Sequence, residues 1–101
     1  MKMKVHSRQG EKIVALCDKE LLGKVLKEGE TVLDLENYRE FYEGEEASVE
    51  EVKEQLKDAS SANLVGKKAV GVALGMGLAK EEDVKNIESV PHLQVYRIPG
   101  E

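Results

Sequence analysis

The apolar positions of the chain form short runs separated by glycine-containing turns. Residues 1–18 alternate apolar and polar positions on both sides of Gln9-Gly10. Glycine readily adopts the positive φ of a tight turn, so this segment predicts a β-hairpin. With Gln9 and Gly10 as the loop, one face of the hairpin collects four apolar residues. They pair as Val5 with Val14 and Met3 with Leu16.

The pattern of residues 48–59 predicts the clearest helix of the chain. Ser48 and Glu51 have the spacing of a capping box, in which each side chain accepts a hydrogen bond from a free backbone amide. Apolar residues then recur at steps of three and four, which gives the helix one apolar stripe. These residues are Val49, Val52, Leu56 and Ala59.

Residues 60–78 hold the densest apolar run, around which the rest of the chain is expected to pack. We expect a short turn through Asn63 and Val65, and then a second helix that starts at Gly66 and ends before Gly77. Gly71 and Gly75 lie four residues apart within this helix, and each costs about 1 kcal/mol relative to alanine. Their presence predicts close packing on a neighbouring helix or strand.

The remaining segments are shorter. Asp18 is placed to cap a helical turn over residues 19–22, and residues 23–37 resemble two extended pieces around Glu28-Gly29. Leu33 and Leu35 share one side of the second piece, 31–36, and are expected to face the core. Residues 80–86 form a polar connection with one helical turn. Proline disfavours α geometry in the residue before it, so Val90-Pro91 predicts an extended entry into a strand over 92–98.

Together these elements predict a small two-layer α+β domain. It would contain the N-terminal β-hairpin and two further strands in a mixed sheet, covered by two or three helices. The 101 residues are enough for a single domain over 1–101. The pattern leaves open whether the last strand pairs with the hairpin or with residues 31–36.

The charge balance limits the classes of partner. Fifteen Lys and Arg residues face twenty Asp and Glu residues, which gives a net charge of −5. An acidic chain does not follow a phosphate backbone with its whole surface, so only a local basic spot or a basic protein partner is compatible with this charge. The abundance of Lys and Glu is typical of proteins from thermophiles.

The compartment follows from what the chain lacks. Cys17 is the single cysteine, so no internal disulfide forms, as is usual in a reducing cytoplasm. Its neighbours Leu16 and Asp18 predict a buried, inert thiol. The N-terminus has no apolar signal region, and no window approaches the roughly 20 apolar residues of a membrane span. We therefore expect a cytoplasmic protein with no membrane partner.

No catalytic or metal-binding motif is present, so no catalytic residue and no cofactor is predicted. The candidate metal ligands are His6, Cys17 and His92. In the expected hairpin, the position of His6 and that of Cys17 lie on the order of 13 Å apart, too far for one zinc ion. His92 follows a proline that can aim its imidazole, although a hydrogen bond at a strand start is the favoured explanation for this residue.

The strongest local feature for binding is the start of the second helix. Free amides and the positive end of the helix dipole at Gly66 favour an anion, and Lys67 and Lys68 add charge. An acidic side chain of the same protein could fill this position instead. The candidate anion-binding or nucleic-acid-binding residues are Asn63, Gly66, Lys67, Lys68, His92 and Arg97.

Three of the four aromatic residues, Tyr38, Phe41 and Tyr42, fall within five positions. Such a cluster can stack on bases or line a ligand pocket. It can also hold a loop on a small core by its large side chains. The glutamates around it would repel phosphate, which favours the second interpretation.

Four segments are recognisable as a set, namely Cys17-Asp18, 21–24, 62–66 and 90–92. Together they resemble a family of small archaeal proteins of unknown function, DUF424. The resemblance covers nearly the whole chain and implies an archaeal cytoplasmic protein of mixed α/β structure, with a link to translation or RNA. It supplies no active site.

Three functions remain open from the sequence. The first is a non-catalytic module that binds RNA or a ribonucleoprotein through the candidate residues above. The second is a protein–protein adaptor or homodimer that uses Gly71 and Gly75 or an exposed strand edge. The third is a small-molecule enzyme, which requires a pocket that brings His92 near an acidic residue or Asn63.

Overall fold

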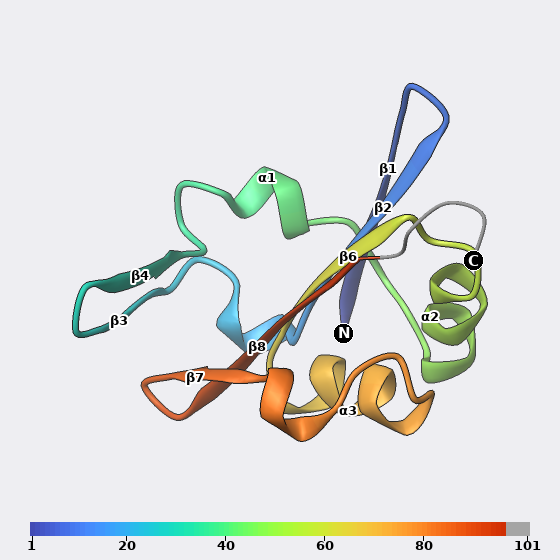
Figure 1. Cartoon of the computed structure of the whole chain (residues 1–101). Coiled ribbons are helices and arrows are strands. Elements are labelled where there is room, and N and C mark those ends of the chain that lie inside the picture. Colours follow the sequence, from blue (N-terminus) through green and yellow to red (C-terminus); the bar gives the residue numbers. More distant parts are fainter. Residues whose placement is uncertain (97–101) are drawn as a thin grey trace.

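One mixed sheet of six strands organises the computed structural model, which describes residues 1–96 (Figure 1). The order across the sheet is β5-β1-β2-β6-β8-β7. The chain is therefore an α+β protein, as the sequence predicts. The strands are β1 (Lys2–Arg8), β2 (Glu11–Cys17), β5 (Glu45–Glu46), β6 (Ser61–Val65), β7 (Lys85–Ile87) and β8 (Val90–Tyr96).

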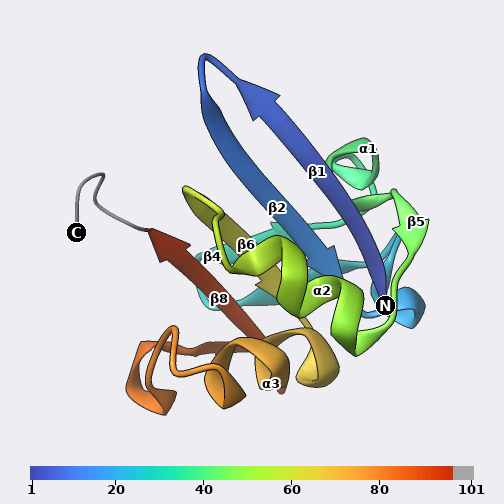
Figure 2. The same cartoon turned by 90° about the vertical axis from the view of Figure 1, so that its right-hand side faces the viewer.

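The N-terminal hairpin has the predicted register. Val5 pairs with Val14 and Met3 pairs with Leu16 in antiparallel strands. Gln9 and Gly10 both have positive φ at the turn between them. The hairpin extends beyond the rest of the sheet (Figures 1 and 2). Val5, in the middle of β1, is exposed although its register is correct, whereas its partner Val14 is buried.

β6 is the main correction to the predicted fold, because a turn was expected at these residues. β6 runs parallel to β2 and antiparallel to β8, at the centre of the sheet. Ala62 and Leu64 are buried on one side, while Asn63 on the other side bonds the side chain of Gln94. This polar contact lets an asparagine occupy a central strand. The last strand therefore pairs with neither of its two expected neighbours.

The predicted third strand lies in a separate two-stranded sheet. β3 (Val25–Glu28) and β4 (Thr31–Asp34) pair with each other and project from the body of the molecule (Figure 1). The turn after β7 holds this hairpin: Lys27 N donates to Glu88 Oε2 at 2.6 Å, and Glu88 N donates to Glu28 Oε1 at 3.0 Å.

Both predicted long helices are present. α2 (Val49–Leu56) starts with the capping box, with distances of 3.1 and 3.2 Å between Ser48 and Glu51. α3 (Lys67–Gly75) starts directly after Gly66. It ends as predicted, because Gly77 has positive φ, its amide bonds the carbonyl of Leu74, and the next amide bonds that of Ala73.

The shorter helices fill the connections. α1 (Arg39–Tyr42) forms where the aromatic cluster was expected to lie in a loop. One 3₁₀ turn spans Lys19–Leu21 and another spans Glu81–Asp83, both within segments where the sequence predicts a helical turn. None of the helices in residues 1–96 has the length and apolar character that crossing a lipid bilayer requires.

The two faces of the sheet carry different cores. α2 and α3 lie side by side over one face (Figure 2), where their apolar stripes bury the main cluster of the described residues. A smaller cluster lies on the opposite face, under α1. It contains Ala15, Cys17, Leu35, Tyr42 and Val65, with Leu33 and Phe41 packed against it. Leu33 and Leu35 thus face the core as predicted.

Gly71 and Gly75 do not pack against their own domain, contrary to the expectation. Both are exposed on α3, and a Cβ added at either would meet nothing within 4 Å. The helix packs on the sheet through its other side, where Ala69, Val70 and Ala73 are buried. Within residues 1–96, no contact therefore requires glycine at these two positions.

Candidate functional site

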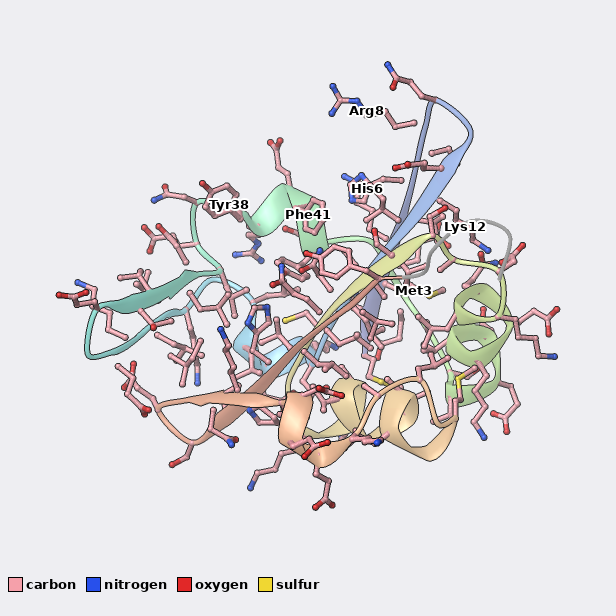
Figure 3. The ribbon with its side chains drawn as sticks, in the orientation of Figure 1. Met3, His6, Arg8, Lys12, Tyr38 and Phe41 are labelled. Atoms are coloured by element: carbon pink, nitrogen blue, oxygen red, sulfur yellow. The ribbon has the colours of Figure 1, made fainter. Side chains whose placement is uncertain are left out.

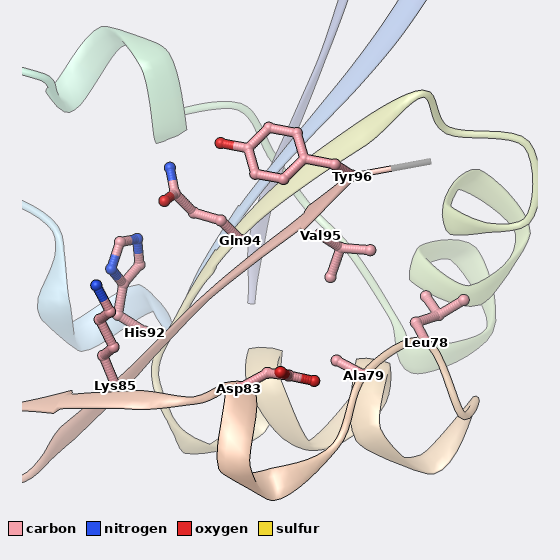
Figure 4. A pocket seen from close by; sticks show the side chains of 8 residues that line it. All are labelled: Leu78, Ala79, Asp83, Lys85, His92, Gln94, Val95 and Tyr96. Carbon is pink, nitrogen blue, oxygen red and sulfur yellow. The ribbon is translucent and has the colours of Figure 1, made fainter. Parts of the chain in front are cut away.

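The open face of the sheet, opposite α2 and α3, gathers polar side chains along β6 and β8. Successive residues of a strand point to opposite faces, so His92, Gln94 and Tyr96 lie on one side of β8 and Val95 lies on the other (Figure 4). Asn63 of β6 pairs with Gln94 across the ladder. Its side chain shares the open face with these three residues.

α1 covers part of the open face because β1 holds its carbonyl groups. Lys4 Nζ donates to the Glu40 carbonyl at 2.8 Å, and His6 Nε2 lies 3.0 Å from the Phe41 carbonyl. The rings of His6 and Phe41 stack with their centroids 4.6 Å apart (Figure 3). Phe41 and the buried Tyr42 thus hold the aromatic segment on the core, as predicted.

Tyr38 does not take part in this packing. Its side chain is 66% exposed at the start of α1 (Figure 3). It stands at the wall of a pocket of about 370 Å³ between α1, β4 and the open face, which we call the tyrosine pocket. The pocket is lined by Leu33, Asp34, Tyr38, Phe41, Tyr42, Asn63 and Gln94.

A second pocket of about 380 Å³, the β8 pocket, follows the outer side of β8 (Figure 4). It exists because β7 pairs with β8 only as far as His92. Within the described chain, residues 93–96 of β8 have no strand neighbour on that side. The pocket is lined by Leu78, Ala79, Asp83, Lys85, His92, Gln94, Val95 and Tyr96.

Gln94 joins the two pockets, since it lines both. Its Nε2 donates to Asn63 Oδ1 at 3.0 Å. Each carboxamide has more donors and acceptors than this one bond uses. Beyond Gln94 the β8 pocket ends at Tyr96, whose side chain is 71% exposed. The open face therefore presents a pair of amide groups between two exposed tyrosines.

His92 faces solvent only in part, and this determines its charge. Burial, together with the nearby ammonium of Lys85, lowers the pKa of the His92 imidazole from its ordinary value of 6.5. The ring is therefore predominantly neutral near pH 7. Asp83 lines the same pocket, but in residues 1–96 no hydrogen bond or ion pair joins it to His92; its carboxylate accepts from Lys80 N at 2.9 Å.

The start of α3 is already bound by an internal carboxylate. Asp18 Oδ2 accepts from Lys68 N at 3.0 Å, and Asp18 Oδ1 accepts from Ala69 N at 2.9 Å. Asp18 was predicted to cap the turn that follows it, but its side chain makes no such bond there. The two amides proposed for an external anion thus have a partner within the chain.

Five of the six predicted site residues lie in the described part of the chain, and they fall into two groups. Gly66, Lys67 and Lys68 line a pocket of about 340 Å³ that also contains Glu20 and Asp18. Both lysines are exposed, whereas Gly66 is buried. Asn63 and His92 lie instead on the open face, and Arg97 lies outside the described residues. Gln94 and Tyr96 were missed, because sequence alternation alone does not show which face of a strand stays uncovered. Tyr38 was noted in the aromatic cluster, but the sequence favoured a packing role for it.

The metal-ligating residue types stay apart. Within residues 1–96, no three side chains of His, Cys, Asp or Glu gather closely enough to hold a metal ion. Cys17 is buried as predicted. Burial, and then the charges of Asp18 and Glu20, raise the pKa of its thiol to about 12. The thiol is therefore protonated and unreactive in the folded protein.

Comparison with known proteins gives two matches. A family model described as a protein of unknown function, DUF424, matches residues 6–98. A solved structure, described as the crystal structure of an uncharacterized conserved protein from Methanopyrus kandleri, is 28% identical with a TM-score of 0.71. The similarity covers 99% of this chain and 96% of that one. No curated protein matches the chain.

Proposed function

The chain belongs to the DUF424 family, and we propose that it is a non-catalytic module that binds single-stranded RNA on the open face of its sheet. One observation carries the proposal. Two exposed tyrosines, Tyr38 and Tyr96, stand on either side of the paired amides of Asn63 and Gln94. Exposed aromatic rings stack on unpaired bases, and amide groups bond the edges of bases.

The groups along the open face favour binding over chemistry. The imidazole of His92 is held neutral by burial and Lys85, and no carboxylate of the described chain is bonded to it. A general base usually needs a partner that orients it. A neutral ring beside Lys85 can instead hydrogen-bond a base or a ribose hydroxyl.

The acidic charge of the protein limits the contact to a short RNA segment. Lys85 lies on the open face, and Lys67 and Lys68 lie exposed in the neighbouring pocket next to Pro91 of β8. These lysines would reach only a few phosphates. Because each phosphate contact contributes about −0.7 to the slope of log affinity against log salt, the slope should be shallow, about −2.

The test is a titration with single-stranded and structured RNA at two salt concentrations. Stacking on one aromatic ring contributes about 1–3 kcal/mol per base, so Tyr96→Ala should weaken binding of single-stranded RNA by about five-fold or more. Tyr96→Phe keeps the ring and should retain most of the affinity. Absence of binding at low salt would exclude the proposed function.

The lysines are tested in the same titration by Lys67→Glu/Lys68→Glu. Lys53→Glu/Lys57→Glu is the matched control, since it makes the same charge change on α2 and at its C-cap, away from the open face of the sheet. Loss of binding in the first variant alone would make the start of α3 a phosphate site. If RNA binding weakens equally in both variants, the effect is due to the change in net charge and not to a phosphate site at α3.

An adaptor or homodimer is the second candidate, and one observation favours it. Gly71 and Gly75 are exposed at a cost of about 1 kcal/mol each, and the domain does not use the close approach that they permit. A partner helix would be able to use it. A mass that rises with protein concentration in sedimentation experiments, and falls back in Gly71→Leu, would support this candidate.

A further inference from the structure

The tyrosine pocket has a wall that is fixed before any ligand arrives. Phe41 is stacked on His6 on one side and meets Tyr42 edge to face, with the Phe41 and Tyr42 centroids 5.1 Å apart. Burial raises the pKa of the Tyr42 hydroxyl to about 12, so this wall is uncharged. Tyr38 stays exposed at the mouth and is free to cover a planar ring from outside.

Asp34 places one fixed negative charge at the pocket. Its Oδ1 accepts from the amides of Glu36 and Asn37 at 3.1 and 2.9 Å, and its Oδ2 accepts from Asn37 Nδ2 at 2.6 Å. These bonds lower the pKa of the carboxyl group, which stays ionised. Oδ2 uses only one bond and can accept another from a ligand. A phosphate in the pocket would be repelled.

The amide pair supplies the opposite side of the pocket. Since Gln94 Nε2 donates to Asn63 Oδ1, the Nδ2 group of Asn63 and the Oε1 atom of Gln94 keep a donor and an acceptor for a ligand. A ligand that fills the pocket must be flat, must carry an N–H group for Asp34, and must offer both a donor and an acceptor along its edge.

Resting on the proposed function, we propose that the tyrosine pocket receives one unpaired base that carries an exocyclic amine, with its phosphate outside. Adenine, cytosine and guanine present such an amine to the Asp34 carboxylate. Uracil does not, and its N3–H group lies between two carbonyl oxygens that the carboxylate repels. The cavity of about 370 Å³ is at the lower end of the range for small-ligand sites, about 300–1,000 Å³, and suits a single nucleoside.

The experiment uses free nucleosides with the intact protein, so it does not depend on RNA binding. Adenosine, uridine and adenosine 5′-monophosphate are titrated while the side-chain amide signals of Asn63 and Gln94 are followed by NMR. We expect adenosine to shift both signals and to bind at least about five-fold more tightly than uridine, which is about 1 kcal/mol. The monophosphate should bind no better than adenosine.

Variants then test the two groups that carry the inference. Asp34→Asn keeps an acceptor oxygen for the turn to Asn37, so the fold should persist while the preference for adenosine over uridine disappears. Tyr38→Ala should weaken adenosine binding and Tyr38→Phe should not. Lys53→Gln on α2 is a control that should change neither value.

The outcomes separate this inference from the proposed function. Equal binding of adenosine and uridine, or no shift at Asn63 and Gln94, would overturn the base site, even if RNA still bound through Tyr96. Selective adenosine binding by a protein that binds no RNA would uphold the site and overturn the RNA function. A preference that persists in Asp34→Asn would also contradict the role of the carboxylate.

Discussion

Asp18 connects two parts of the chain that lie fifty residues apart. Its carboxylate, only 4% exposed, follows the end of β2 and binds two amides at the start of α3. Gly66 makes room for it: φ is 108° there, and a Cβ would lie 2.3 Å from Asp18 Cγ. The carboxylate and the missing side chain therefore form one structural unit that joins the sheet to α3.

Replacing Asp18 should lower the free energy of unfolding. Asp18→Ala leaves the amides of Lys68 and Ala69 without an acceptor, and loss of a helix cap together with buried amides costs about 2 kcal/mol or more. Asp18→Asn keeps one acceptor oxygen and should lose less. Urea unfolding of the three proteins measures the difference, and an alanine variant as stable as the parent would contradict this role.

This residue also shows the limit of local patterns. The sequence predicts that Asp18 caps the turn directly after it, which is wrong, and that the start of α3 attracts an anion, a place that the Asp18 carboxylate itself takes. The sequence does not show that Asp18 and the start of α3 bind each other, since the contact depends on β2 and β6 lying side by side. The pairing of Asn63 with Gln94 escapes the sequence for the same reason.

At the scale of elements, one side of α3 is packed on the sheet and the other side is exposed. Ala69, Val70 and Ala73 are buried against the sheet, while Gly71 and Gly75 face open space. In a helix interior glycine is less favourable than alanine by about 1 kcal/mol. Glycine at these two positions therefore makes α3 less stable in the isolated chain than alanine would.

Alanine at these two positions should stabilise the protein. Gly71→Ala and Gly75→Ala should each raise the free energy of unfolding by up to about 1 kcal/mol, because the added methyl group meets nothing and the unfolded chain loses freedom. Gly66→Ala should instead destabilise strongly, because of its positive φ and the contact with Asp18. Thermal unfolding followed by circular dichroism compares all three, and destabilisation by Gly71→Ala would contradict the exposed position.

The elements were predicted with uneven success for physical reasons. The first hairpin, α2 and α3 have local signals, namely a glycine turn, a capping box and a glycine stop. β6 has none, because Ser61 and Asn63 break its apolar run and its partners are distant in sequence. The separate sheet of β3 and β4 depends on contacts with the turn at Glu88, which no periodicity reveals.

At the scale of the whole molecule, both faces of the sheet contribute to stability. The open face also makes the free energy of unfolding depend on pH. The smaller cluster under α1 buries Cys17 and Leu35. On the same face, His92 of β8 is half-buried beside Val65 of β6. Since the pKa of His92 is lowered in the folded state, the unfolded chain binds a proton more readily than the folded protein does.

Stability should therefore fall as the pH drops through the ordinary His value of 6.5 toward the lower folded pKa. His92→Gln should remove this part of the pH dependence. The carboxyl groups with lowered pKa act in a lower window, below the ordinary values of 3.8 for Asp34 and 4.5 for Glu51. Unfolding free energies measured between about pH 7.5 and 5.5 isolate the histidine, and parallel curves for the two proteins would contradict this assignment.

The parallel pairing of β2 with β6 has a consequence for how the chain folds. β1 and β2 can pair early in folding, because only a two-residue turn separates them. Cys17 pairs with Val65 only after the whole intervening segment has closed into a loop. Contacts of such high sequence separation slow the search for the native state. The centre of the sheet is therefore completed late: β6 must leave the ribosome before β2 acquires its parallel neighbour, and β8 must follow before β6 is paired on both sides.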